Sequence, residues 1–464
     1  MAKYKAYPEY KNSGVEWLGD IPLNWHIHSL KRAVDSCTNG VWGGEPDDKH
    51  DLIVLRVADF ERQSFKISDS KLTTRSILPK DRGSRLLKKG DLLIEKSGGG
   101  EKTLVGCVVL FDKEYEAVTS NFVAKMSPRE SYDSHFLTYV FSQLYAGKVN
   151  YPSIKQTTGI QNLDADAYLM EKFCFPPMHE QRNISCFLDY ETAKIDNLIE
   201  KQQQLIELLK EKRQAVISHA VTKGINPDVP MKDSGVKWLG EVPAHWELIP
   251  LKYLCNFSGG GTPTKDNLSY WKGGTVPWVS PKDMKSFWIS ETQDYVTPKA
   301  VSESSTNYVE EGSLLMVVRS GILQRNIPVA INIIKVTMNQ DMKALKFNER
   351  MKVHYAAYFI NGNVNSLLLE WTKEGATVES IEHEYLANSL IPVPPIEEQY
   401  SIIKSISQQM KRFESLEEKA IIGIRLLQER RTALISAAVT GKIDVRDWVA
   451  PETQKAGKPE ETAV

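Results

Sequence analysis

The sequence lacks the features of a membrane, secreted or zinc-binding protein. No apolar run approaches the roughly 18 residues that span a bilayer, and residues 1–7 contain no apolar signal core. The five cysteines are an odd number without a close pair, which argues against a disulfide framework and against a zinc site of the C-x-x-C type. We therefore expect isolated buried thiols in a cytoplasmic protein.

Catalytic motifs are missing as well. Neither Pro-Pro pair follows an Asn or Asp, the residue with which a DNA adenine methyltransferase holds its target base. The sequence has no G-x-G-x-x-G after a predicted strand, no G-x-x-x-x-G-K-[ST] and no H-E-x-x-H. Glu-x-Lys occurs only at 9–11 and 417–419, in an N-terminal arm and on a predicted helix. We therefore expect neither a catalytic residue nor a metal site.

The net charge gives little sign of a nucleic-acid partner. It is −1 over 464 residues, a length that exceeds one hydrophobic core and predicts two to four domains. Residues 71–102 nevertheless contain nine Lys or Arg against four Asp or Glu. Either a solvated surface or a local basic face explains this run, so nucleic-acid binding stays open.

The sequence does contain one long amphipathic pattern written twice. Apolar residues alternate three and four apart over 184–216 and again over 402–434, which predicts two long coiled-coil helices. Both helices begin after Pro-Pro and end with Ala-Val-Thr, and we expect Glu191 in the first to face Gln409 in the second. The seam residues are Ile184, Leu188, Ile195, Leu198, Leu205, Leu209 and Val216 in the first helix and Ile402, Ile406, Phe413, Leu416, Leu427 and Leu434 in the second.

A second repeat precedes each helix. The block S-G-V-x-W-L-G-x-[IV]-P-x-x-W occurs at 13–25 and at 234–246, and two tryptophan pairs at one spacing indicate a duplication. In the globular unit that follows the first block, a helix is expected near 134–144. Short strands, each a β-branched or aromatic run bounded by turn residues, are predicted at 53–57, 90–95, 105–111 and 121–126.

The second globular unit repeats this frame with different contents. Residues 90–94 align with 312–316, and Lys96-Ser97-Gly98 aligns with Arg319-Ser320-Gly321. A frame that is kept while its contents change suggests one scaffold carrying two specificities. The predicted fold class is α+β, with two α/β domains separated by two long antiparallel coiled-coil helices and related by an internal pseudo-two-fold duplication.

The predicted domain plan follows the repeats. It consists of an N-terminal arm (1–12), a first domain (13–175), a central helix (176–224), a linker (225–233), a second domain (234–393), a distal helix (394–443) and a disordered tail (444–464).

The chain resembles the specificity subunits of type I restriction-modification enzymes. The tryptophan block, the G-[DS]-L-L-x-x-x-[KR]-S-G segment and the Pro-Pro-x-x-Glu-Gln helix entry carry this resemblance over about residues 13–443. In that family, two target-recognition domains each read half of a bipartite DNA site, while the helices set the spacer and bind two modification subunits. The resemblance implies a non-catalytic subunit of a hetero-oligomer, with restriction subunits as further partners. It places S-adenosylmethionine, ATP and Mg in those partner subunits and none in this chain.

Polar side chains on loops at strand ends are the candidates for contacts with DNA. Arginine can bind guanine through two hydrogen bonds, and glutamine suits adenine. Lys96 and Arg319 are the preferred candidates because we expect them to occupy equivalent positions. The full set is Lys96, Ser97, Lys102, Gln156 and Thr157 in the first domain and Arg319, Ser320, Gln324, Arg325 and Lys373 in the second.

Other classes of protein share parts of this pattern. A coiled-coil scaffold with two protein-binding domains would have the same architecture, and binding of sequence-defined duplex separates the two hypotheses. A single-chain methyltransferase-nuclease would need the catalytic motifs that are missing. The specificity chain of a related bipartite-site methyltransferase-nuclease stays an alternative.

Overall fold

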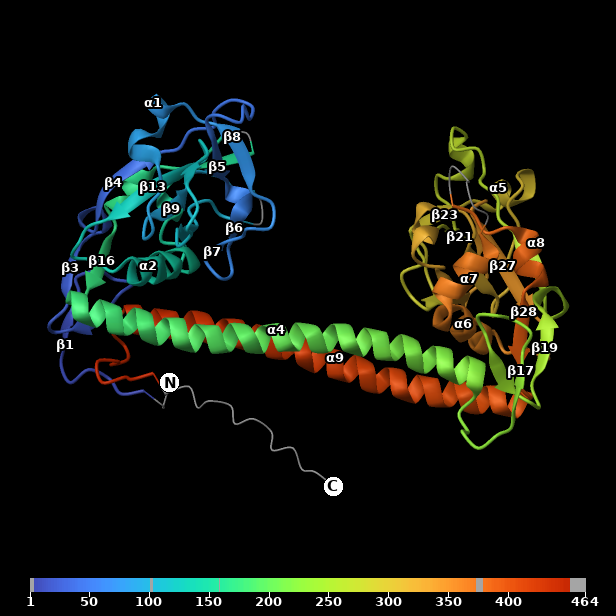
Figure 1. Cartoon of the computed structure of the whole chain (residues 1–464). Coiled ribbons are helices and arrows are strands. Elements are labelled where there is room, and N and C mark those ends of the chain that lie inside the picture. Colours follow the sequence, from blue (N-terminus) through green and yellow to red (C-terminus); the bar gives the residue numbers. More distant parts are fainter. Residues whose placement is uncertain (1–3, 101–102, 158, 373–378, 451–464) are drawn as a thin grey trace, which may run out of the picture. The chain divides into compact units, whose positions relative to one another are not determined.

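The computed structural model describes residues 4–100, 103–157, 159–372 and 379–450 (Figure 1). The chain divides into two compact units. The first unit is Met1–Gln202 together with Ile422–Val464, and the second is Gln203–Ile421. Each unit therefore combines one globular domain with one half of each long helix.

Two main sheets form the first domain. One has the strand order β11 (Val108–Leu110), β9 (Leu92–Glu95), β13 (Val123–Pro128), β4 (Val34–Asn39), and the other β12 (Ala117–Thr119), β5 (Asp51–Leu55), β8 (Thr73–Ser76). The smaller sheets are β10 (Ser97–Gly98) with β15 (Ile160–Leu163) and β14 (Ile154–Thr157), β16 (Lys172–Phe175) with β3 (His26–Ser29), β1 (Tyr10–Asn12) with β2 (Asp20–Pro22), and β6 (Phe60–Glu61) with β7 (Lys66–Ile67). The helices are α1 (Pro79–Arg82), α2 (Ser134–Ala146) and α3 (Ala165–Leu169).

The second domain repeats both main sheets. One has the order β22 (Trp288–Ile289), β25 (Val329–Asn332), β24 (Leu314–Val317), β27 (Met342–Phe347), β20 (Cys255–Gly259), and the other β26 (Thr337–Met338), β21 (Val276–Val279), β23 (Asp294–Val296). The strand pairs are β28 (Leu390–Val393) with β19 (Glu247–Pro250) and β18 (Glu241–Pro243) with β17 (Met231–Asp233). The helices are α5 (Pro298–Glu303), α6 (Val353–Gly362), α7 (Val364–Trp371) and α8 (His383–Asn388).

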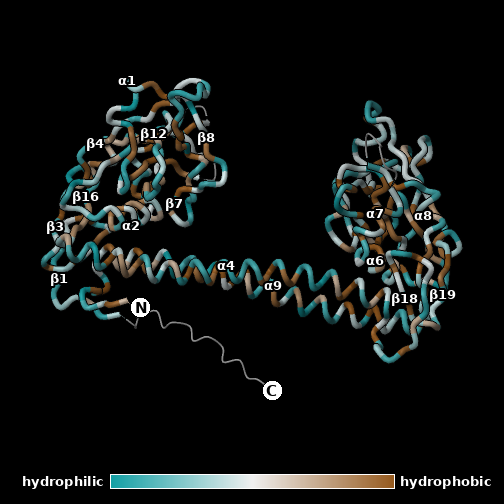
Figure 2. Tube along the Cα trace, in the orientation of Figure 1, coloured by the Kyte–Doolittle hydropathy of each residue, from teal (hydrophilic) through white to brown (hydrophobic). Residues whose placement is uncertain are grey.

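The predicted α+β fold and its duplication are confirmed. The order β11-β9-β13-β4 in the first domain matches β25-β24-β27-β20 in the second, and β22 is an addition. All four residues of β9 and all four of β24 are buried, because each strand lies in the middle of its sheet. Figure 2 shows the corresponding hydrophobic segments inside each domain, whereas hydrophilic and hydrophobic residues alternate along the long helices.

The two long helices are α4 (Met178–Lys223) and α9 (Ile396–Val439), of 46 and 44 residues. Both begin directly after the predicted Pro-Pro pairs. At a helix N-terminus the missing N–H of proline breaks no intrahelical hydrogen bond, and acidic residues interact favourably with the helix dipole. Among the helices that the structure describes, none is both long and apolar enough to cross a membrane. All five cysteines are free thiols, but the prediction that they are buried is wrong for Cys186, which is exposed, and for Cys37, which is half-buried.

The helices run in opposite directions beside each other in each unit. In the first unit Asp196 forms an ion pair with Arg431 at 2.9 Å, and Ile184 near the start of α4 lies in the same core cluster as Val439 at the end of α9. The expectation that Glu191 faces Gln409 is therefore wrong. Equal positions in two antiparallel helices lie at opposite ends, so Glu191 belongs to the first unit and Gln409 to the second.

The predicted seam is buried only towards the ends of the helices. Ile184, Leu188 and Ile195 are buried in the first unit, as are Leu209, Ile402 and Ile406 in the second. Ile184 and Leu188 belong to the core cluster of the first domain, and Ile402 and Ile406 to that of the second. Val216, Phe413, Leu427 and Leu434 are half-buried. Towards the middle of the two helices the predicted seam residues are less buried. The exposed seam residues are Leu198, Leu205 and Leu416.

Part of the predicted tail is structured. Val445 is 2% exposed in the first core cluster, and Trp448 packs edge-on against Phe187 of α4. The expectation that the tail from residue 444 lacks core-forming residues is therefore wrong for residues 444–450. Residues 451–464 lie outside the described part of the chain.

Candidate nucleic-acid interface

The first candidate surface lies where β9 ends. Lys96 follows β9, and its Nζ donates a hydrogen bond to Asn39 Oδ1 at 2.7 Å. The backbone carbonyl of Asn39 accepts a hydrogen bond from Arg85 Nε at 3.2 Å. Two cations from the basic run 71–102 thus converge on Asn39, a residue that the sequence pattern did not single out.

A buried ion pair supports the end of β9. Glu95 is fully buried, and both of its carboxylate oxygens accept hydrogen bonds from the Arg62 guanidinium at 2.7 and 2.8 Å. These hydrogen bonds to Glu95 raise the pKa of Arg62. Because paired charges in a buried fork have one favoured geometry, Arg62 fixes the strand from which Lys96 projects.

The small sheet β10-β15-β14 brings other predicted residues to the same place. Ser97 in β10 donates to Asn162 Oδ1 of β15 at 2.6 Å, and Gln156 in β14 lies opposite Gln161 of β15. Gln161 is buried; it accepts from the Val105 N–H and donates to the Gly100 carbonyl, so it holds the loop after β10. Its burial could not be read from a lone glutamine in the sequence.

The second candidate surface follows β24. Arg319 is exposed, and it forms an isolated bridge with Ser380. Ser320 caps the 3-10 helix Gly321–Gln324, accepting from the Ile322 N–H at 3.4 Å. Leu323 is buried in that helix, which leaves Gln324 and the following Arg325 exposed.

The structure corrects the predicted equivalence of Lys96 and Arg319. The backbone carbonyl of Lys96 accepts a hydrogen bond from the Leu163 N–H, and that of Val318 accepts one from the Ile381 N–H, both at 2.8 Å. Arg319 therefore occupies the position of Ser97, and the sequence alignment was one residue out of register after the strand. A shift of one residue turns a strand side chain to the opposite face, so shared charge was a misleading guide to position.

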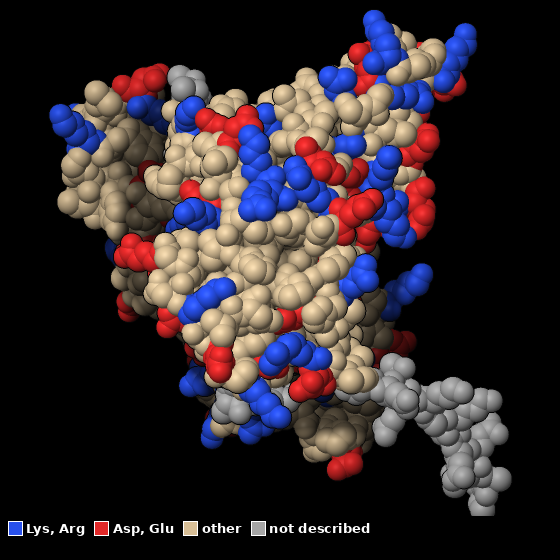
Figure 3. Space-filling model, turned by 90° about the vertical axis from the view of Figure 1, so that its left-hand side faces the viewer, with Lys and Arg blue, Asp and Glu red and all other residues tan. Residues whose placement is uncertain are grey.

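Three predicted residues are not fully described. Lys102 and Lys373 lie outside the described residues, and Thr157 belongs to β14 but its side chain is not described. On the face drawn in Figure 3, Lys and Arg side chains are interspersed with Asp and Glu. The basic side chains on this face are therefore local and do not form a continuous basic surface. Within the described residues, no three His, Cys, Asp or Glu side chains gather as a metal site would require.

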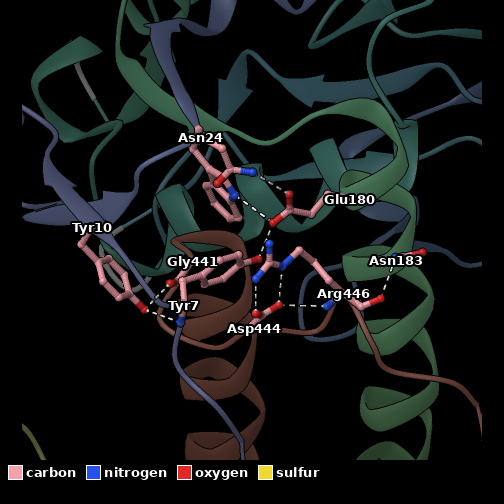
Figure 4. A network of polar contacts seen from close by, with 9 residues as sticks. Tyr7, Tyr10, Asn24, Glu180, Asn183, Gly441, Asp444 and Arg446 are labelled. Atoms are coloured by element: carbon pink, nitrogen blue, oxygen red, sulfur yellow. Dashed lines mark hydrogen bonds and ion pairs between the residues drawn. The ribbon is translucent and has the colours of Figure 1, made fainter.

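The first tryptophan block closes onto the start of α4 (Figure 4). Glu180 is fully buried and accepts hydrogen bonds from the Tyr7 hydroxyl, from Trp25 Nε1 at 2.9 Å and from Asn24 Nδ2 at 3.4 Å. Burial and the bond to Glu180 raise the pKa of Tyr7. The repeated tryptophan and the repeated Pro-Pro-x-x-Glu-Gln thus form one junction, which explains why both recur together.

The second junction has the same arrangement of tryptophan block and helix start, but its contacts are weaker. Glu398 pairs with His245 at 2.7 Å, and both side chains are partly exposed. In both junctions the tryptophan block also binds a lysine from the C-terminal end of the other long helix. Lys442 Nζ donates to the carbonyls of Leu18 and Asp20, and Lys223 Nζ donates to those of Leu239 and Glu241.

Each unit also exposes apolar side chains on its helix halves. In the first unit a shallow groove beside Leu198 is lined by Tyr190 and Lys194. Single exposed apolar residues are ordinary, but a group on helices is typical of a surface that another protein covers. The exposed set is Leu198, Ile422 and Leu426 in the first unit and Leu205, Leu208, Leu416 and Ile421 in the second.

Two domains that repeat the same main sheets, with different side chains at matching strand ends and a shared pair of long helices, define a duplicated two-domain protein. Residues 243–425 match the family model described as type I restriction modification DNA specificity domain. The chain is 24% identical over 450 residues to a putative type I restriction enzyme MjaX specificity subunit of Methanocaldococcus jannaschii, covering 92% of this chain and 96% of that one. It is 37% identical over 150 residues to the EcoR124I/EcoR124II specificity subunit of Escherichia coli, covering 32% of this chain and 37% of that one.

Solved structures show the same fold. The HsdS subunit from Thermoanaerobacter tengcongensis superimposes with a TM-score of 0.54 at 15% identity, over 91% of this chain and 98% of that one. A chain from a study of complex assembly and conformational transition of the type I R-M system gives a TM-score of 0.69 at 15% identity, over 91% and 99%. The chain is therefore similar in sequence to the specificity subunits of type I restriction enzymes and shares the fold of the solved ones.

Proposed function

We propose that this chain is the DNA-specificity subunit of a type I restriction-modification complex. Each domain reads one half of a bipartite, asymmetric duplex site. The observation that carries the proposal is the duplicated scaffold with unlike side chains at equivalent positions, such as Ser97 against Arg319 and Lys96 against Val318. One backbone frame with two sets of polar groups suits two different half-sites, because base edges are distinguished by their donors, acceptors and methyl groups.

The helices serve the rest of the assembly. At 1.5 Å per residue, the 46 residues of α4 span about 69 Å. A helix of this length can define a spacer between half-sites, and the exposed apolar residues on each unit's helix halves suit the docking of two modification subunits. Catalysis, with S-adenosylmethionine, ATP and Mg, belongs to the modification and restriction subunits in the cytoplasm.

Methylation mapping tests this function. DNA from cells that make the chain with its modification subunits should carry methylated adenines in one bipartite sequence, and cells without this chain should carry none there. The purified chain alone, incubated with labelled S-adenosylmethionine and duplex, should leave the DNA unlabelled. A partnered complex that binds all duplexes equally would instead support a scaffold that binds proteins.

A further inference from the structure

The loop beside each candidate surface is built on one backbone plan. In the first domain it joins β12 to β13, and the Phe122 carbonyl accepts hydrogen bonds from the N–H groups of Lys96 and Ser97, at 2.8 and 3.2 Å. In the second domain the loop joins β26 to β27, and the Asp341 carbonyl accepts from Val318 and Arg319, at 2.8 and 3.3 Å. Phe122 and Asp341 therefore occupy equivalent positions next to the predicted base-contacting residues.

A glycine from the neighbouring strand locks each loop. Gly40 N–H donates to Val123 and Gly260 N–H to Met342, at 3.1 and 3.3 Å. A Cβ on Gly40 would lie 2.1 Å from the Thr119 carbonyl oxygen, and a Cβ on Gly260 would lie 1.8 Å from that of Asn339. Only glycine allows so close an approach, and the loops are held in a defined conformation on both sides.

The side chains that these equivalent loops present are chemically opposite. Phe122 is 55% exposed although it is aromatic and its backbone is fixed. Asp341 is half-buried, and its Oδ2 accepts hydrogen bonds from Asn339 Nδ2 and Gln340 Nε2, at 3.4 and 3.3 Å. The backbone is fixed at this position in both domains, but it carries an exposed aromatic ring in one and a carboxylate in the other. Such a position is suited to selecting between bases.

We propose that this loop position reads one base pair in each half-site. Phe122 contacts the C5 methyl group of a thymine, which is the apolar group on a base edge in the major groove. Asp341 accepts a hydrogen bond from the N4 amino group of a cytosine. A carboxylate beside the phosphate backbone is repelled, and adenine would place its N7 acceptor against the same carboxylate, so cytosine is the base that suits Asp341. This inference rests on the proposed function.

Selection from a pool of random duplexes tests both residues. The complex of the full chain with its modification subunits should enrich a bipartite sequence with thymine at one position of one half-site and cytosine at one position of the other. Phe122→Ala should lose the thymine preference alone. Asp341→Asn should exchange cytosine for adenine, because an amide both donates to N7 and accepts from N6.

Modified bases give a second readout on the selected duplex. Replacing the thymine with deoxyuridine removes only the methyl group and should weaken binding by the wild-type complex about fourfold, which corresponds to ~0.8 kcal/mol for one buried CH2 group. The Phe122→Ala complex should not distinguish the two duplexes. Leu23→Ala is the matched control, because Leu23 is 51% exposed but lies in the turn between β2 and β3.

The outcomes separate this inference from the proposed function. If the wild-type complex enriches no bipartite sequence, the proposed function fails. If it enriches one, while Phe122→Ala and Asp341→Asn keep every base preference, then the loop position does not read DNA and the inference alone is overturned. Thermal unfolding of both variants should match the wild type, since Phe122 is exposed and Asp341→Asn is isosteric.

Discussion

Arg319 combines a fixed backbone with an exposed cation. Its N–H donates to the Asp341 carbonyl, and its side chain is exposed at the end of β24. The equivalent Ser97 is shorter and donates its hydroxyl hydrogen to Asn162. At the level of single residues, the two domains therefore differ in reach as well as charge, and Arg319 can extend to a guanine edge where Ser97 cannot.

Replacing Arg319 with alanine should identify what it contacts. If it binds a base through two hydrogen bonds, Arg319→Ala should cost about 1 to 3 kcal/mol of binding and relax selection at one position of one half-site. If it contacts phosphate, all sequences should weaken together and the salt dependence should become shallower. Affinity measured against a series of half-site duplexes at several salt concentrations distinguishes these results, and unchanged values would remove Arg319 from the interface.

His135 predicts a pH effect on the first unit. Its Nδ1 lies 3.4 Å from Asp189 Oδ2, and Asp189 also accepts from the Tyr139 hydroxyl. The hydrogen bond to Asp189 raises the pKa of His135 above its usual value of ~6.5. The stabilisation is therefore complete below about pH 6.5 and is lost as the pH rises through the higher folded-state pKa.

The test compares wild type with His135→Gln across that window. Raising the pH from about 5.5 to about 8, on either side of the ordinary histidine pKa, should lower the melting temperature of the wild type more than that of the variant. Asp112 and Lys66 line the same cavity, of about 250 Å³. Equal pH dependence in both proteins would show that the pair adds nothing.

At the scale of elements, the long helices were predictable and the local register was not. Apolar periodicity sustained over 184–216 has few structural alternatives, so the start of α4 after Pro177 followed directly. The four residues of β9 are all buried and give no alternation from which to read a face. The alignment of Lys96 with Arg319 failed for this reason, because backbone hydrogen bonds, and not side-chain chemistry, set the register.

The junction between the tryptophan block and α4 should be more sensitive than its repeat. Glu180→Gln replaces one acceptor oxygen with an amide donor that faces the donors Tyr7, Asn24 and Trp25 in a buried site. It should cost about 1.5 to 3 kcal/mol of stability, the range for hydrogen bonds to charged groups. Glu398→Gln is the matched control, and its partly exposed pair with His245 should cost less than about 1 kcal/mol. Thermal unfolding measures both, and hydrogen exchange over the first turns of α4 locates the loss. Equal destabilisation of the two variants would contradict the structural difference between the junctions.

At the scale of the whole molecule, the duplication makes the C-terminal ends of the two long helices equivalent. Lys223 at the end of α4 and Lys442 after α9 donate to equivalent carbonyls, although the sequence order of Lys and Gly is reversed between them. The two ends are thus interchangeable in the contact that each makes with a tryptophan block. A chain cut after Gly224 keeps one domain, one tryptophan block and the complete α4.

We predict that a fragment of residues 1–224 dimerises. Without α9, the first domain loses Ile435 and Val439 from its core cluster, while Ile217 and Val221 of α4 become uncovered. Burying such side chains contributes roughly 1.5 to 3 kcal/mol each, less the cost of association. A second copy of α4 can supply both missing surfaces, with its Lys223 taking the place of Lys442 on the carbonyls of Leu18 and Asp20. Such pairing is isologous and gives a two-fold dimer.

Sedimentation velocity should show the dimer, and methylation mapping with the modification subunits should show an inverted repeat of the first half-site. Val221→Asp should give monomers, because Val221 is fully buried in the full chain, whereas Leu208→Asp should leave the dimer intact, because Leu208 is 61% exposed there. Because Leu208 is already exposed in the intact chain, it contributes nothing to the helix packing that the dimer must reproduce. A fragment that stays monomeric, or that directs methylation to the original asymmetric sequence, would therefore show that the two helix ends are not interchangeable.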